Sequence, residues 1–324
     1  MTDQQTTSAT TPATPTATAA AAPAEQLGDA LSPTERAARN DAARAALVRR
    51  QRLSSIGKHA ALIVLGLLML YPVLWMVVSS LRPNGYIFNN PGLILNTFAA
   101  ENYTNGWNAL AQPFGTYLAN SAIIVVGSIV GNVLTCSLAA YAFARLRFRF
   151  KRLAFAAMLV TMMLPIHVLI IPQYVIFSQL DWINTYLPLI VPKFLATDAF
   201  FIFLMVQFIR GIPRELDEAA RIDGAGHVRI FVQIMLPLMT PALATTAIFT
   251  FIWTWNDFFG QLIFVTDPDK YTASVALRSF IDTQSQSDYG ALFAMSVVTL
   301  LPVFLAFLLG QRFLLRGIAT TGGK

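Results

Sequence analysis

Residues Tyr117–Ala144 read YLANSAIIVVGSIVGNVLTCSLAAYAFA, a run of 28 residues that contains no Asp, Glu, Lys or Arg. A helix needs roughly 20 mainly apolar residues to cross about 30 Å of hydrocarbon, because it rises about 1.5 Å per residue. This run exceeds that length. It therefore predicts a transmembrane helix.

Five further apolar runs flank this one and decide the fold class. They are much longer than the roughly 10-residue alternating segments of transmembrane strands, and 55% of all residues are hydrophobic whereas 12% are charged. We therefore predict an all-α integral membrane protein with six transmembrane helices. The run at 187–209 is the least regular, because it carries Lys193 and Asp198. The five runs cover residues 60–80, 154–180, 187–209, 238–265 and 289–311.

The positive charges predict the orientation. Nineteen of the 23 lysines and arginines lie before the first run, between the second and third, between the fourth and fifth, or after the last. Cytoplasmic loops are enriched in these residues, so both termini and the loop at 210–237 are predicted to be cytoplasmic. The chain is then a multi-pass protein of the cell (plasma or inner) membrane, in contact with lipid. Nucleic acid is not an expected partner despite the charge of +6, because these cations border spans and form no single stripe with interleaved aromatics.

Two tails flank the predicted membrane domain at residues 59–316. Residues 1–58 form the first tail, which we expect to be disordered in its Ala-, Thr- and Pro-rich first 31 residues. Alanines and arginines then alternate over 32–52, which predicts a short basic helix on the inner leaflet or a simple topogenic flank. Residues 317–324 form the predicted cytoplasmic C-terminal tail.

The charged loop at 210–237, between the fourth and fifth spans, predicts a short helix at its start. Pro213 suits the first turn of a helix. Three acidic residues follow, Glu215, Asp217 and Glu218, and their charge favours the positive N-terminal end of a helix.

The same loop predicts a sharp turn and a second helix. Leu216, Ala219 and Ala220 fall on one side of the first helix by their spacing. Asp223-Gly224 ends it, because glycine readily adopts the left-handed conformation that helix ends favour. A second helix begins near His227 and places four apolar residues along one side: Val228, Phe231, Val232 and Met235.

Two interpretations of this loop compete, an amphipathic connector on the membrane surface and an element that docks in a groove of another protein. A specific spacing favours docking. The loop reads Glu218-Ala219-Ala220, three residues, Gly224, nine residues, Ile234, one residue and Leu236-Pro237.

That spacing and several ordered motifs make the chain resemble the membrane subunit of ATP-binding-cassette (ABC) importers, in particular the carbohydrate-uptake branch with the smaller maltose-permease subunit. The resemblance covers about Tyr117 to Lys324. The other motifs are Asn120-Ser121, Ala139–Arg145, Met163-Leu164-Pro165, Ile171-Pro172, Asp223-Gly224-Ala225, Trp255-Asn256-Asp257, Gln311-Arg312-Phe313 and Gly317. The chain departs from the family at its end, where Gly322-Gly323-Lys324 stands in place of the common Gly-Ala-Val-Lys-Gly.

The resemblance implies a division of labour. The chain would pair with a second permease chain as a heterodimer, two ATPase subunits would drive alternating access, and an extracytoplasmic solute-binding protein would deliver a sugar or sugar-like solute. It also implies a set of ATPase-coupling residues, in which Glu218 pairs with a cation of the ATPase, the two alanines permit close approach and Gly224 makes the turn. The set is Glu218, Ala219, Ala220, Asp223 and Gly224.

No residue is predicted to be catalytic. The sequence lacks the phosphate-binding pattern Gly-x4-Gly-Lys-Ser/Thr, and no His, Asp and Glu cluster has the spacing of a metal site. Cys136 is the only cysteine, which excludes an intrachain disulfide and a cysteine-built metal site. The chain is therefore expected to be a non-enzymatic transport subunit without cofactor or metal.

Polar residues at membrane depth are candidates for the solute pathway, because ionisable groups are costly there. Trp255, Asn256 and Asp257 lie near the outer end of the fifth span. They either line a cavity for a sugar or act as an interfacial anchor and a helix cap. Lys193 and Asp198 are either tethered to each other or placed in an outer cavity.

Two other classes of protein remain as alternatives. A secondary transporter would use Asp257 or His167 to carry protons, although inverted repeats with broken helices are not visible. His167 is otherwise a packing residue. A membrane-embedded enzyme lacks any nucleophile-and-base pattern in the apolar core. Co-purification of ATPase subunits distinguishes an importer from a carrier that acts alone.

Overall fold

The computed structural model describes residues 33–95, 97–281 and 287–319, and these residues form helices without any β-strand. The predicted all-α class is confirmed for this part of the chain. Two units are described separately, residues 1–71 and 72–324. The predicted disordered stretch at the N-terminus lies outside the described residues, as do residues 320–324 of the C-terminal tail.

The basic segment and the first apolar run form one helix, α1 (Pro33–Ser79). Residues 32–52 were predicted to be either a short basic helix on the inner leaflet or a simple topogenic flank of the first span, and the structure makes them helical from Pro33 onward. The chain between Arg52 and Ala60 contains no proline and only one glycine, Gly57. Alanine, leucine and arginine, which are frequent on both sides, all favour helix. The two parts therefore continue into each other.

Four helical segments among the described residues are long and apolar enough to cross a membrane, and a bent pair adds a possible fifth. The bent pair joins 227–238 to 240–256 at an angle of 74°. The predicted first, second, fourth and sixth spans correspond to the four segments, and the predicted fifth to the bent pair. The four segments are Leu47–Ser79, Phe114–Arg145, Leu187–Arg210 and Tyr289–Arg312.

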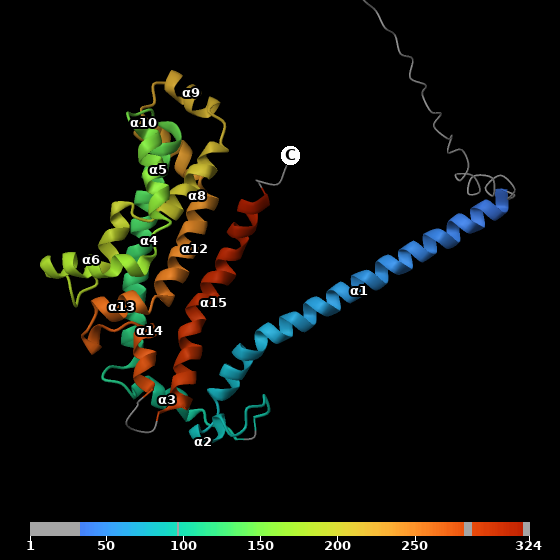
Figure 1. Cartoon of the computed structure of the whole chain (residues 1–324), viewed down its shortest axis with the longest axis horizontal. Coiled ribbons are helices and arrows are strands. Elements are labelled where there is room, and N and C mark those ends of the chain that lie inside the picture. Colours follow the sequence, from blue (N-terminus) through green and yellow to red (C-terminus); the bar gives the residue numbers. More distant parts are fainter. Residues whose placement is uncertain (1–32, 96, 282–286, 320–324) are drawn as a thin grey trace, which may run out of the picture. The chain divides into compact units, whose positions relative to one another are not determined.

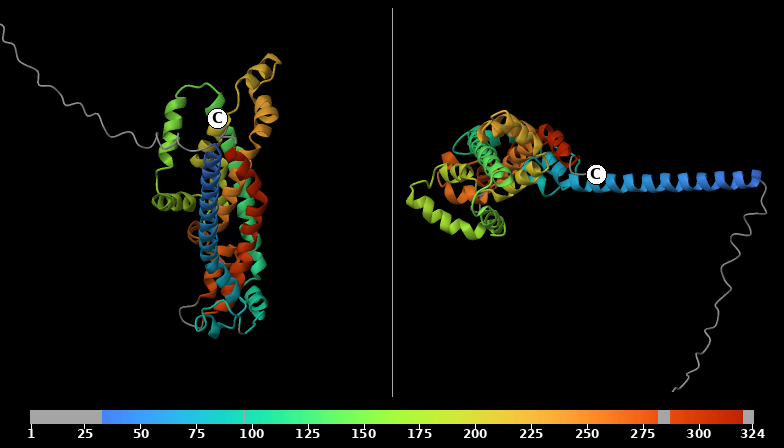
Figure 2. Two further views of the ribbon diagram at one scale, coloured as in Figure 1. Left: turned by 90° about the vertical axis from the view of Figure 1, so that its right-hand side faces the viewer. Right: turned by 90° about the horizontal axis from the view of Figure 1, so that it is seen from above.

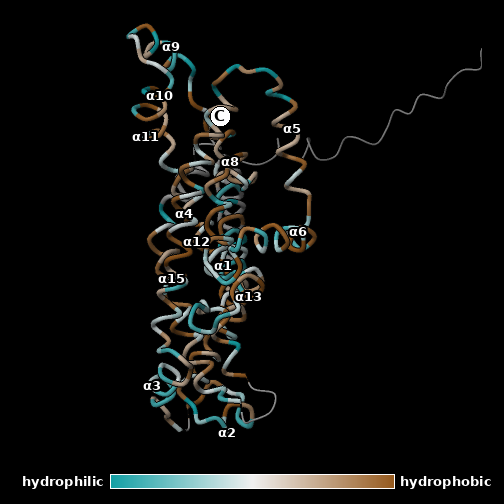
Figure 3. Tube along the Cα trace, turned by 90° about the vertical axis from the view of Figure 1, so that its left-hand side faces the viewer, coloured by the Kyte–Doolittle hydropathy of each residue, from teal (hydrophilic) through white to brown (hydrophobic). Residues whose placement is uncertain are grey.

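The predicted third span differs from the structure. Residues 154–180 are divided between α5 (Lys151–Thr161) and α6 (Ile166–Gln179), and neither helix is long enough to cross alone. The break lies before Pro165, whose ring disfavours helical backbone at the preceding residue. Figure 3 shows that α6 is nonetheless coloured hydrophobic along most of its length.

A set of long helices forms the core of the second unit. Figure 1 shows α4 (Phe114–Arg145) beside α8 (Ala199–Arg210) and α12 (Thr240–Asn256), with α15 (Tyr289–Ala319) beside α12. The helix before α8 is broken into α7 (Leu187–Ile190) and the 3-10 segment η1 (Val191–Leu195). A cluster of buried apolar residues joins α4 and α8 to the segments before α12, and its fully buried members include Phe201, Met205, Met235 and Met239.

Two glycines let α4 approach η1 closely. A Cβ atom at Gly127 would lie 2.9 Å from Ile190 Cγ2, and one at Gly131 would lie 2.9 Å from the backbone carbonyl carbon of Lys193. Small residues four positions apart are the usual means by which membrane helices pack at short distance.

One end of the second unit carries the charged loop. It contains α9 (Glu215–Ile222), α10 (His227–Ile230), the π-helical segment η2 (Phe231–Met235) and α11 (Leu236–Leu238). Figures 1 and 2 agree that α9 and α10 project from this end of the long helices. We call residues 215–230 the elbow.

The opposite end carries α2 (Asn84–Ile87) and α3 (Glu101–Asn108). Arg82 is 2% exposed and donates hydrogen bonds to the carbonyls of Asn90, Gly92 and Ile94 at 2.6, 2.6 and 2.7 Å. These bonds fold the segment after α1 into a compact cap. The remaining short elements here are α13 (Phe259–Phe264), η3 (Pro268–Lys270), α14 (Ala273–Ala276) and η4 (Leu277–Phe280).

Candidate functional site

The elbow turns where the sequence predicts. Gly224 has φ +79, and its N–H donates to Arg221 O at 3.0 Å while Ala225 N–H donates to Ala220 O at 2.9 Å. These bonds satisfy carbonyls at the end of α9, and the left-handed conformation costs glycine little. The predicted role of Gly224 in ending the helix is confirmed.

The elbow has an inner and an outer face. Asp217 and Ala220 are buried, whereas Glu218, Ala219 and Asp223 are exposed. The predicted common face is therefore divided, because Ala220 packs inward while its neighbour Ala219 faces outward.

The exposed surface of the elbow carries two large apolar side chains. Ile222 is 87% exposed and Val228 is 78% exposed. Val228 also lines an open depression of about 550 Å³. Its lining residues are Gly226, His227, Val228, Arg229, Val232 and Gln233.

The inner face is fixed to α4 by an ion pair that the sequence analysis did not identify. Arg145 Nε lies 2.9 Å from Asp217 Oδ2, and the two side chains are 4% and 6% exposed. Arg145 Nη2 also donates to Ile212 O at 2.6 Å. The sequence showed only a cation at the end of a span and an acid in a helix's first turn, because a pair separated by 72 positions leaves no local pattern.

A ring contact supports the same attachment. The rings of Tyr141 on α4 and Phe231 on η2 lie 5.2 Å apart. Both residues belong to the buried cluster that also contains Ala144, Ala220 and Ile230. The cluster joins the end of α4 to both helices of the elbow.

Trp255, Asn256 and Asp257 each have a different hydrogen-bond partner. Trp255 is 5% exposed, and its Nε1 donates to Thr299 O of α15 at 3.1 Å. Asn256 is exposed, and its Nδ2 donates to Ile252 O at 2.8 Å. Asp257 Oδ1 accepts the backbone N–H of Gly260 at 3.0 Å. The local contacts are those of a packed tryptophan and a cap.

A polar cluster lies within the long helices. Lys193 Nζ is 3.0 Å from Asp198 Oδ2, and Asn132 Nδ2 donates to the same oxygen at 2.6 Å and to Thr250 Oγ1 at 3.2 Å. Of the two placements that the sequence left open for Lys193 and Asp198, the mutual tether is present. His167 lies elsewhere, with its ring edge-on to Phe259 at 5.2 Å.

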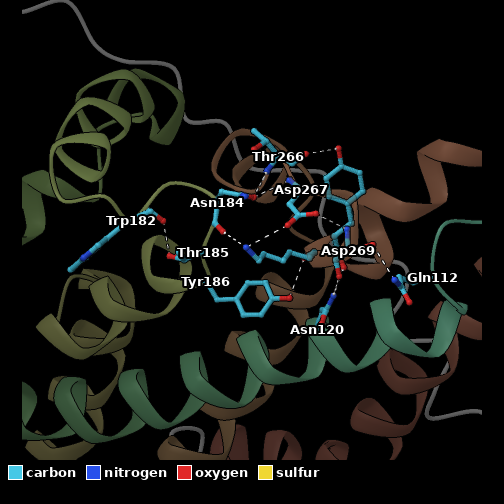
Figure 4. A network of polar contacts seen from close by, with 11 residues as sticks. Gln112, Asn120, Trp182, Asn184, Thr185, Tyr186, Thr266, Asp267 and Asp269 are labelled. Carbon is cyan, nitrogen blue, oxygen red and sulfur yellow. Dashed lines mark hydrogen bonds and ion pairs between the residues drawn. The ribbon is translucent and has the colours of Figure 1, made fainter.

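A network at the end opposite the elbow ties α4 to two loops (Figure 4). Asn120 Nδ2 donates to Asp269 O at 3.1 Å and to Tyr271 O at 2.9 Å. Lys270 Nζ donates to Asn184 O at 3.1 Å and lies 3.5 Å from Asp267 Oδ2. The chain segments 184–186 and 266–271 are thereby held against the first turns of α4.

The described residues contain no group of three or more His, Cys, Asp or Glu that could hold a metal ion. The polar contacts described above belong to three features of this part of the chain: the elbow, the polar cluster and the network.

Residues 131–319 match the model of a protein family, the inner membrane components of binding-protein-dependent transport systems. The chain belongs to this family. Members of the family are the permease subunits of ABC importers, so the resemblance drawn from the sequence motifs is confirmed.

Three relatives of this permease illustrate the similarity. The diacetylchitobiose uptake system permease of Streptomyces coelicolor is 35% identical over 271 residues, which is 83% of this chain and 89% of the relative. The sn-glycerol-3-phosphate transport system permease of Yersinia pestis is 33% identical and covers 84% and 98%. The arabinooligosaccharides transport system permease of Halalkalibacterium halodurans is 32% identical and covers 78% and 91%.

The permease fold also matches a solved structure. A chain of a bacterial ABC transporter involved in the import of the acidic polysaccharide alginate aligns with a TM-score of 0.72 at 23% identity, over 82% of this chain and 97% of that one. At this identity the match establishes the fold. The comparisons therefore describe a multi-pass membrane permease subunit of the carbohydrate-uptake kind, and its relatives are transport components.

Proposed function

We propose that this permease is one membrane-spanning half of an ABC importer for a sugar or sugar-like solute. It pairs with a second, different permease chain, and two separate ATPase subunits drive alternating access of the solute pathway. An extracytoplasmic binding protein delivers the solute. The outer face of the elbow is the observation that carries this proposal.

That face has the features of a docking surface. Ile222 and Val228 are among the most exposed hydrophobic residues of the structure, and apolar side chains exposed on a loop outside the membrane are available for contact with a protein partner. Glu218 and Asp223 are exposed alongside them, and Ala219 leaves room for close approach. An exposed ion pair from Glu218 adds only about 0–1 kcal/mol, so the apolar contact supplies most of the affinity and the acids supply orientation.

The orientation follows from the same assignment. ATPase subunits work in the cytosol, so the elbow is cytoplasmic, and the positive charges near both termini place the tails at 1–58 and 317–324 on that side. Together α5 and α6 supply the remaining membrane segment, which completes six within residues 59–316. The network in Figure 4 then lies on the outer side.

The class of solute is supported by the relatives. A chitobiose derivative, a glycerol phosphate and arabinose oligomers, the compounds in their names, all carry several hydroxyl groups. Asn256 and Asp257 are the candidate contacts for such hydroxyls, because their side chains are at least partly exposed. Trp255 holds the same segment against α15 through its hydrogen bond to Thr299 O.

The test is to purify the chain with its partner permease in mild detergent and to identify the proteins that accompany it. ATPase subunits should co-purify, and uptake into proteoliposomes should require ATP. Ile222→Asp should release the ATPase subunits, while Ile94→Asp, which changes a residue 77% exposed at the opposite end, should retain them.

Two outcomes would contradict the proposal. A chain that catalyses uptake without ATPase subunits, driven by a proton gradient, is a secondary transporter. Retention of the ATPase subunits by Ile222→Asp would show that they dock elsewhere than on the elbow.

A further inference from the structure

The ion pair between Arg145 and Asp217 is buried where the elbow, the proposed docking surface, meets α4, a helix of the membrane domain. Arg145 is the last residue of α4, and Asp217 lies in the first half of α9. Their side chains are 4% and 6% exposed, and the charged atoms are 2.9 Å apart. Among the described residues, Asp217 Oδ1 accepts no hydrogen bond, and the carboxylate is paired with Arg145 through Oδ2.

We propose that Arg145 and Asp217 are positioning residues that transmit movement of the elbow to α4. This inference rests on the function proposed above. In that proposed function, neither Arg145 nor Asp217 contacts the solute or the ATPase. The pair links the docking surface to the helix at the centre of the membrane domain.

A buried ion pair suits this task better than an apolar contact. Apolar side chains can slide past each other at low cost, whereas separating two buried charges leaves each one unpaired in a poorly solvated place. The elbow and the end of α4 therefore move together, or the pair breaks at high cost. The second bond of Arg145, to Ile212 O at 2.6 Å, holds the chain that enters the elbow to the same point.

The far end of α4 shows where the movement is delivered. Asn120 Nδ2 donates to the carbonyls of Asp269 and Tyr271, and Ser121 Oγ accepts the N–H of Ala273 at 2.9 Å. Between its ends α4 packs along α8 and α12. One helix thus joins the elbow to the loop at the opposite end, with polar attachments at each end.

The experiment compares variants in the complete complex of both permeases and both ATPase subunits. Arg145→Gln and Asp217→Asn remove one charge each with little change of shape, Arg145→Lys keeps the charge but loses the forked geometry, and Arg145→Asp with Asp217→Arg exchanges the charges. Arg147→Gln is the matched control, because Arg147 is exposed two residues away. The measured quantity is the number of solute molecules imported per ATP hydrolysed by reconstituted complex.

The two neutral variants should retain the ATPase subunits and hydrolyse ATP, while solute imported per ATP falls about fivefold or more. The exchanged pair should recover part of that ratio, and Arg147→Gln should match the wild-type chain. A merely structural role would lower the yield of complex and leave the ratio in assembled complex unchanged.

A wild-type ratio in both neutral variants overturns the inference. If those variants yield no complex, Arg145→Lys decides, since a lowered ratio supports the inference and a wild-type ratio overturns it. Failure of the proposed function would give a different result, because the wild-type chain would then show no ATP-driven uptake.

Discussion

Lys193 Nζ lies 3.0 Å from Asp198 Oδ2, although five positions separate the residues and a regular helix would direct them to different sides. The backbone between them explains the contact. Val191–Leu195 is a 3-10 segment, and Ala196 has φ 54, so the backbone between the two residues departs from a regular α-helix before α8 begins. The break in this predicted span is what brings the two charges together.

Removal of one charge should therefore destabilise the membrane domain. Asp198→Asn should lower the apparent free energy of unfolding in detergent by about 1 to 2 kcal/mol, a value reduced because both side chains are partly exposed. Adding Lys193→Gln should recover part of the loss. Thermal unfolding followed by tryptophan fluorescence gives the double-mutant cycle, with the exposed Arg278→Gln as control. Additive losses would show that the two charges do not interact.

The close approach of α4 to η1 predicts a graded effect of two glycine substitutions. Gly131→Ala should cost about 1–3 kcal/mol, because its Cβ meets the backbone of Lys193, which cannot move without η1. Gly127→Ala should cost less, because its Cβ meets only side-chain atoms of Ile190 and no backbone atom. Melting temperatures of the purified variants test the order. Equal temperatures for both variants would contradict this packing.

Gly224 should be sensitive to substitution through its backbone alone. No described atom lies within 4 Å of a Cβ built at Gly224, but its φ of +79 strains other residues, so Gly224→Ala should cost about 1 kcal/mol in the elbow. Gly224→Asn should have a smaller effect, because asparagine tolerates this conformation. Hydrogen exchange over the elbow should be faster in the alanine variant. Gly85→Ala, also without a neighbouring atom, is the control.

The proposed coupling makes a functional prediction at the same position. Gly224→Asp should let ATP hydrolysis continue while solute uptake falls, because it adds a side chain and a negative charge at the exposed turn and leaves the membrane helices intact. Hydrolysis and uptake are measured together in proteoliposomes. Normal uptake by this variant would exclude a coupling role for the turn.

Tyr186 predicts a pH effect at the end opposite the elbow. Burial, and then the nearby Asp267 carboxylate, raise the pKa of Tyr186 above its usual 10.0. The folded chain therefore keeps a proton that the unfolded chain loses near pH 10, so stability falls from about pH 10 until the pH passes the folded pKa. Tyr186→Phe should remove this part of the alkaline loss. Unfolding curves between about pH 9 and about pH 11 test it, and identical slopes for both chains would contradict it.

The elbow shows how far sequence reasoning reached. Glycine at a helix end and acids in a first turn are local patterns, and both appear in the structure at the predicted residues. The predicted common side of Val228, Phe231, Val232 and Met235 does not appear, because the chain passes from α10 into the π-helical η2, so that Phe231 and Met235 are buried while Val228 and Val232 are exposed. The predicted common side of Leu216, Ala219 and Ala220 is divided in the structure, since Ala220 is buried and Ala219 is exposed, and this division could not be known because it depends on how the elbow is attached to α4. The role of Arg145 was invisible for the same reason.

The membrane segments show a similar division. Length and hydropathy predicted four segments that the structure forms as helices long enough to cross, and a fifth that it forms as the bent pair, because the hydrocarbon thickness fixes how many apolar residues a crossing requires. They did not show that residues 154–180 break into α5 and α6, since Pro165 is compatible with a kinked helix as well as with a break.

The amino-acid sequence by itself determined the class of the protein, its apolar segments and the helix-turn-helix elbow, because each depends on residues within about 30 positions of one another and on the solvent around them. Only the tertiary structure decided which polar groups meet. Arg145 pairs with Asp217, and Asn132 donates a hydrogen bond to Asp198, each between different elements of the fold. The energy of such contacts depends on burial and on distance in space, and neither is written in the order of the chain.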